Sequence, residues 1–186
     1  MSLLDITVLG HPILRQETTP VAEVTDELRT LIDDMFETMY AARGIGLAAP
    51  QVGRTERIAV VDVDGARYVL VNPEVVEEEG EQRGEEGCLS IPEVFGDVTR
   101  SARVKVRALD RDGQPYEVEA TGLLATCFQH EIDHLHGKLF IDYLSFLKRR
   151  SALGQWEALK AKYPAGLRKL TPEEIASLHE EPEDAL

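Results

Sequence analysis

The stretch FQHEIDHLHG, residues 128–137, constrains the fold more than any other part of the sequence. Its residues and those just before it predict a helix over 122–136. Because each residue of an α-helix turns by about 100°, His130 and His134 lie about 40° apart around the axis and one turn apart along it. Both imidazoles can therefore reach one metal ion. Glu131 points about 100° away, which suits a base acting on a metal-bound water rather than a ligand.

A catalytic metal site usually takes three protein ligands and leaves one position for water, so a third ligand is needed. No H-x-x-G-x-x-H extension follows His134, which weakens the case for the common zinc proteases. Cys127 shares the helix face of the histidines, but its Cα lies about 10.5 Å from that of His134 along the axis. We interpret Cys127 as a small buried residue that lines the pocket. Cys88 can present a thiolate from a distant loop, so we expect Cys88, His130 and His134 to bind the metal.

Two other polar residues lie near the histidines in the sequence. Asp133 follows His130 by three residues, and we expect it to hydrogen-bond to a ligand rather than to bind the metal. His136 follows His134 by two residues and therefore faces away from the site, so we expect it at the surface.

A second glycine-rich stretch, RGIGLAAPQVG at residues 43–53, carries no nucleotide-binding signature. Its glycines follow a predicted helix and precede a predicted strand, the reverse of the dinucleotide-binding order. We expect the glycines to let the backbone run close to an extended ligand. Gln51 would then offer its side-chain amide to a developing oxyanion. A tight surface turn with an exposed glutamine is the alternative.

The remaining pattern predicts an α+β fold in which mixed or antiparallel strands pack around the metal-binding helix, with one helix near each end of the chain. The third helix should bury Leu153, Trp156 and Leu159 along one side. The predicted helices cover 26–42, 122–136, 147–162 and a short segment that begins after Thr171. The predicted strands lie in 57–65 and 68–79, and two more strands lie in 97–120, joined by a turn at Asp-Gly.

The length of 186 residues fits one domain, which we place at residues 1–170 and follow with an acidic tail at 171–186. No segment approaches the roughly 20 apolar residues that span a bilayer, so no membrane association is expected. The N-terminus carries no secretory signal, and we expect a cytoplasmic protein without a disulfide. The net charge of −14 argues against DNA binding.

Three stretches together resemble the ordered motifs of the peptide deformylases: GIGLAAPQ at 44–51, EGCLS at 86–90 and HEIDH at 130–134. The similarity runs from TVLGHPILR to LFIDYLS, about three quarters of the chain, and is closest to the compact bacterial form. It implies removal of the formyl group from N-formylmethionine at the start of newly made polypeptides, with release of formate. It also implies Cys88, His130 and His134 as ligands of a divalent metal, with Fe²⁺ expected natively and Zn²⁺, Ni²⁺ or Co²⁺ as other occupants.

The resemblance and the chemistry of amide hydrolysis assign further roles. Glu131 takes the proton of the attacking water and passes it to the departing amine. The Gln51 amide and, by resemblance, the Leu89 backbone N–H stabilise the oxyanion. Phe95 stands where some family members carry a substrate-holding arginine, whereas Arg100 fits a later Val-x-Arg. Candidates for substrate binding are the backbone of Gly46 and, around the methionine side chain, Ile45, Leu123, Thr126 and Cys127.

Two other functions compete with this hypothesis. A metal endopeptidase would cleave internal peptide bonds, whereas a metal-binding module associated with the ribosome would catalyse no reaction. The presence of Glu131 and Gln51 favours an enzyme, because neither residue is needed merely to hold a metal. Residues 146–170 contain seven Lys or Arg and one acid, whereas 171–186 contain six acids and no Lys or Arg. The basic helix either is solvated or touches ribosomal RNA near the exit of nascent chains.

Overall fold

The structure is a computed structural model that describes residues 2–180, and the last part of the predicted acidic tail, 181–186, lies outside them. The predicted α+β class is confirmed. The helices are α1 (Asp26–Ala41), α2 (Gly122–Leu135), α3 (Phe146–Leu159) and α4 (Pro172–Leu178). The strands are β1 (Ile6–Thr7), β2 (Gly46–Ala48), β3 (Ile58–Val63), β4 (Ala66–Glu79), β5 (Gln82–Cys88), β6 (Ile91–Arg100), β7 (Arg103–Leu109), β8 (Pro115–Thr121) and β9 (Leu167–Arg168).

The strands form one five-stranded antiparallel sheet in the order β2-β3-β4-β7-β8 and two small pairs, β5-β6 and β1-β9. The predicted turn at Asp-Gly is confirmed: β7 and β8 pair across residues 110–114, where the Asp110 N–H donates to the Gln114 carbonyl at 2.9 Å. The sequence pattern missed β5, because its residues QRGEEGC are rich in glycine and charge. Residues 97–100 belong to β6 and pair with β5 rather than opening the β7–β8 hairpin.

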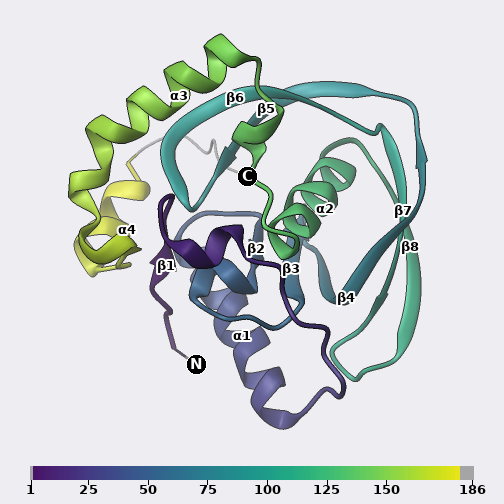
Figure 1. Cartoon of the computed structure of the whole chain (residues 1–186). Helices are drawn as coiled ribbons and strands as arrows, with labels where there is room; N and C mark the ends of the chain where they lie inside the picture. Colours follow the sequence, from purple (N-terminus) through teal and green to yellow (C-terminus); the bar gives the residue numbers. More distant parts are fainter. Residues whose placement is uncertain (1, 181–186) are drawn as a thin grey trace.

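Helix α2 lies at the centre of the fold, between the five-stranded sheet and the β5–β6 hairpin (Figure 1). Its apolar face is buried. On that face Phe128 packs edge-on against Tyr68, with ring centroids 5.2 Å apart. The helix ends at Leu135, and Gly137 follows with a φ of 72°, which suits glycine. A Cβ at Gly137 would come within 2.6 Å of the Arg15 carbonyl oxygen, so the N-terminal segment packs directly on this turn. These contacts fix the position of the two histidines.

The other helices follow the prediction with one correction. Thr25 caps α1 through its side chain, and α3 begins at Phe146 and continues into a short turn of 3₁₀ helix. The expected apolar side of α3 is wrong at Leu153, which remains 38% exposed. Trp156 is buried as expected and donates from Nε1 to the Leu9 carbonyl at 3.2 Å. Helix α3 therefore rests on the body along a narrow stripe.

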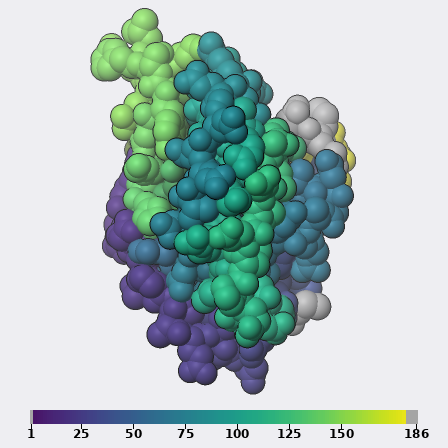
Figure 2. Space-filling view, turned by 90° about the vertical axis from the view of Figure 1, so that its right-hand side faces the viewer, coloured from purple at the N-terminus to yellow at the C-terminus, as the bar shows by residue number. Residues whose placement is uncertain are grey.

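The surface view in Figure 2 shows strands of the large sheet in teal, with the light-green residues of α3 projecting at one end. Thr171 caps α4 as predicted, since its hydroxyl accepts from the Glu174 N–H at 3.2 Å. Between residues 2 and 180, every helix is too short or too polar to cross a lipid bilayer.

Candidate metal centre

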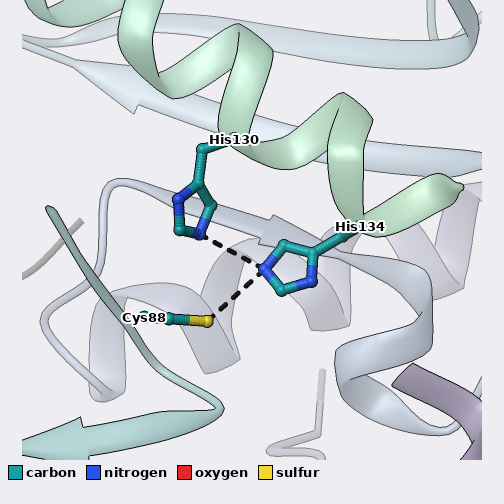
Figure 3. A group of neighbouring side chains, drawn as sticks. All are labelled: Cys88, His130 and His134. Atoms are coloured by element: carbon teal, nitrogen blue, oxygen red, sulfur yellow. Dashed lines mark hydrogen bonds between the residues drawn. The ribbon is translucent and has the colours of Figure 1, made fainter. Parts of the chain in front are cut away.

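Cys88, His130 and His134 meet in the interior of the protein. Their possible ligand atoms all lie within 4.8 Å of one another, and all three side chains are buried. The Cys88 Sγ is 3.4 Å from the His134 Nε2, which is 3.2 Å from the His130 Nε2. Figure 3 shows the sulfur approaching from the β5 side while both rings descend from α2. The three donors therefore surround one point.

The sequence places Cys88 here through the β5–β6 hairpin. Cys88 is the last residue of β5 rather than part of a free loop, and it pairs with Ile91 across the tight turn. A register shift interrupts the regular pairing of β5 with β6 between Glu86 and Cys88. Only glycine fits at position 87, because the Cβ of any other residue would lie 2.8 Å from the Phe95 ring.

A buried ion-pair network connects the hairpin to α2. The Glu86 carboxylate accepts from Arg100 Nε at 2.8 Å and Nη2 at 2.9 Å, and from His130 Nδ1 at 2.9 Å. Arg100 also donates to Asp133 at 2.6 Å, which in turn accepts from the Tyr143 hydroxyl at 2.7 Å. Burial raises the pKa of Glu86, but the hydrogen bonds from Arg100 and His130 outweigh it and lower the pKa to about 2.

This network corrects the expected role of Asp133. Asp133 hydrogen-bonds to Arg100 and Tyr143 rather than to a histidine among the described residues, and Glu86 is the carboxylate that orients His130. No role for Glu86 was predicted from the sequence. The alternation of side chains along a strand could have indicated it, because residues 86 and 88 share one face of a regular strand. His136 is exposed as predicted and lies 2.6 Å from a Glu17 oxygen.

The donor set fits a divalent metal ion. Because the ionised Glu86 can only accept, it fixes the proton of His130 on Nδ1 and leaves Nε2 with a lone pair facing Cys88 and His134. Nε2 of His134 faces the same point, while its Nδ1 has no hydrogen-bond partner within residues 2–180. A thiolate and two imidazoles form a set that zinc, iron, cobalt and nickel all accept.

Glu131 lies beside this centre, also buried. Its Oε2 has no hydrogen-bond partner among the described residues, although the side chain is only 1% exposed. Burial raises the pKa of Glu131 to about 7, while the neighbouring His130 acts in the opposite direction. Gly46 makes room for this carboxyl, because a Cβ there would lie 2.4 Å from Glu131 Oε1. The carboxyl therefore faces the backbone of β2 across the site.

Gln51 is buried in a 3₁₀ turn, Ala49–Val52, so an exposed surface turn is ruled out. Its Oε1 accepts from the Ala48 N–H at 2.9 Å, which orients the amide. Its Nε2 lies 3.6 Å from Cys88 Sγ and donates to Ser90 Oγ at 3.1 Å. The Gln51 amide donor therefore points at the same hairpin turn that carries Cys88 and Leu89.

The other predicted residues lie around this centre. Leu89 follows Cys88 in the hairpin turn and is buried. The Cys127 thiol is buried and lies 3.7 Å from the Ile45 carbonyl oxygen. Thr126 accepts from the Gln82 amide at 3.0 Å, whereas Leu123 is 51% exposed on the same helix. The structure thus brings Cys88, His130 and His134 close together and leaves Leu123 exposed on α2.

Comparison with known proteins agrees with this geometry. The family model for polypeptide deformylase matches residues 3–150. The chain belongs to the polypeptide deformylase family. It is 56% identical over 163 residues to the peptide deformylase of Alkalilimnicola ehrlichii, covering 86% of this chain and 92% of that protein. Deformylases are metal-dependent hydrolases, which agrees with the expected set of metal ligands.

Solved deformylase structures share the fold. The enzyme from Legionella pneumophila is 48% identical with a TM-score of 0.81, and the match covers 88% of this chain and all of that chain (100%). The enzyme from Synechococcus elongatus, solved in complex with actinonin, is 44% identical with a TM-score of 0.79, covering 82% of this chain and 86% of that chain.

The Glu86→Gln variant tests the carboxylate that orients His130. Without the charge, the Nδ1 proton is held less firmly and the ring loses basicity, so metal affinity should fall by about 10- to 100-fold. Competition with a chelator measures the affinity. Glu85→Gln, the same change on the exposed neighbour in β5, should alter affinity less than about twofold, in line with its lack of a buried contact. Equal affinities in the two variants would contradict this role for Glu86.

Proposed function

We propose that the chain hydrolyses the formamide bond of N-formylmethionine at the N-terminus of newly synthesised polypeptides and releases formate. The observation that carries this proposal is the buried Glu131 carboxyl beside three convergent donors, Cys88, His130 and His134. A site that only stored metal would not need a buried carboxyl without a partner. Membership of the deformylase family supports the same reaction.

Cys88, His130 and His134 would hold the metal. A divalent cation held there would supply Lewis acidity toward the formyl oxygen and would make water a stronger nucleophile near neutral pH. We propose Fe²⁺ as the native ion, with Zn²⁺, Ni²⁺ and Co²⁺ able to bind the same donors.

Glu131 moves the proton in the reaction. Its carboxylate accepts a proton from the attacking water and then donates it to the nitrogen of the departing amine, so the carboxylate is regenerated in each turnover. The absence of a partner for Oε2 within residues 2–180 leaves that oxygen able to bond to water or substrate. Gly46 leaves room for this carboxyl, because a Cβ there would lie 2.4 Å from its other oxygen, Oε1.

Two donors stabilise the negative charge that develops on the formyl oxygen. The Gln51 amide is held in place by its bond to the Ala48 N–H, so it needs little reorganisation during the reaction. The Leu89 backbone N–H follows the cysteine ligand in the same turn. We also propose that the Gly46 backbone holds the peptide, while Ile45, Leu123, Thr126 and Cys127 surround the methionine side chain.

The proposal also covers the domain organisation, the location and the partners of the chain. We assign the catalytic domain to residues 1–170 and treat 171–186 as an acidic segment that contains α4. We place the enzyme in the cytoplasm, where nascent formylated chains occur. Helix α3 would dock on the ribosome: Lys148 and Arg150 are exposed there, next to Phe146 and Leu147 with 77% and 74% of their surfaces exposed.

The Glu131→Gln variant tests the catalytic role directly. Formate release from formyl-Met-Ala-Ser, measured with the Fe²⁺, Ni²⁺ and Zn²⁺ forms, should fall by about 10²- to 10⁴-fold because the proton acceptor is lost. Metal content should stay at one ion per chain, since Glu131 is not a ligand. Glu85→Gln should retain full activity. Absence of formate with every metal in the unmodified chain, or cleavage of internal peptide bonds, would overturn the proposal.

Ribosome docking makes a separate prediction. Lys148→Glu combined with Arg150→Glu should abolish co-sedimentation with ribosomes at low salt, because both cations lie on the exposed side of α3. The control combines Arg83→Glu with Arg107→Glu, which alters charge equally on exposed strands. Equal co-sedimentation of the two double variants would remove the docking role of α3.

A further inference from the structure

The segment Leu167–Leu178 lies beyond the part of the chain that the family model matches, residues 3–150. It is nevertheless built into the fold. Strand β9 pairs with β1, with Arg168 opposite Ile6, and α4 follows after a short turn. Figure 1 shows α4 in yellow, close to β1 and to the end of α3.

A cavity of about 650 Å³ lies between this segment and the β5–β6 hairpin. Its lining includes Cys88 and Leu89 of the hairpin and Ser177 and Leu178 of α4. Its volume lies within the range of ligand cavities, roughly 300–1,000 Å³. Because Cys88 is a proposed metal ligand, the cavity reaches one side of the proposed metal centre.

Two sets of hydrogen bonds hold the segment against residues that line this cavity. Arg168 donates from Nη1 to the Leu89 carbonyl at 3.3 Å and from Nε to Glu174 at 2.5 Å. Arg168 is only 5% exposed, so this pair is shielded from water. Arg43 donates to the Leu178 carbonyl at 2.5 Å. The segment is therefore attached both to the hairpin turn and to the start of the glycine-rich stretch.

The walls suit an extended peptide. Phe95 and Tyr163 contribute apolar surface, while Glu93 and Lys162 form an ion pair at 3.5 Å on the same wall. Apolar patches with a few polar groups accept both the side chains and the backbone amides of a peptide. A peptide whose formyl group lies beside Cys88 and Leu89 could extend along this cavity, because both residues also line it.

We propose that β9 and α4 form the outer wall of the cleft that receives the peptide residues following formylmethionine. This inference rests on the proposed function. It assigns the beginning of the acidic segment a part in substrate binding, through contacts that a dipeptide is too short to reach. The segment should therefore contribute to KM for longer peptides and leave kcat unchanged, since it touches none of the groups that move protons.

A deletion tests the wall. Removal of residues 171–186 should raise KM for formyl-Met-Ala-Ser-Ala by about threefold to tenfold, because the longer peptide would lose its contacts with α4. KM for formyl-Met-Ala and kcat for both peptides should stay unchanged. Removal of residues 181–186 alone, which keeps α4, is the control and should leave all constants unaltered.

A second variant avoids any effect of the deletion on folding. Ser177→Trp would place a ring in the cavity and should raise KM for the tetrapeptide only, whereas Ala176→Trp, at a neighbouring position that does not line the cavity, should not. An unchanged or lower tetrapeptide KM in both Ser177→Trp and the 171–186 deletion would overturn the inference. Loss of formate release from the unmodified chain would instead refute the proposed function.

Discussion

The docking of the β5–β6 hairpin on α2 is the constraint on which the rest of the structure depends. It is held by one buried carboxylate, Glu86, which joins Arg100 of the hairpin to His130 of the helix. Burial of a single unpaired charge costs several kcal/mol, so this carboxylate is tolerated only while both partners are in place. The same contact that stabilises the hairpin also orients the ring of His130, a proposed metal ligand. Stability and function therefore depend on a shared interaction.

Much of the site follows from local rules that the sequence makes visible. The two histidines of α2 share one face because helical geometry leaves no other arrangement, and the thiolate of Cys88 is the donor best able to complete the set. The glycine at position 46 was expected to bring backbone close to a ligand. The structure adds that the space it leaves belongs to the Glu131 side chain.

The remainder depends on contacts between segments distant in the sequence. Strand β5 has weak strand propensity and exists because β6 pairs with it, so local pattern could not reveal it. The partner of Asp133 could not be read from helical spacing, because Arg100 reaches it from another strand. Leu153 fits a helical apolar stripe, yet α3 packs on the body along too narrow a line to cover it.

The most direct test of the metal centre is X-ray absorption at the zinc edge of the zinc-loaded protein. We expect one sulfur at about 2.3 Å and two imidazole nitrogens at about 2.0–2.1 Å, with one ion per chain. The sulfur signal should vanish in Cys88→Ser and persist in Cys127→Ser, since only the first thiol lies beside both histidines. A sulfur signal that survives in Cys88→Ser and disappears in Cys127→Ser would contradict the proposed centre.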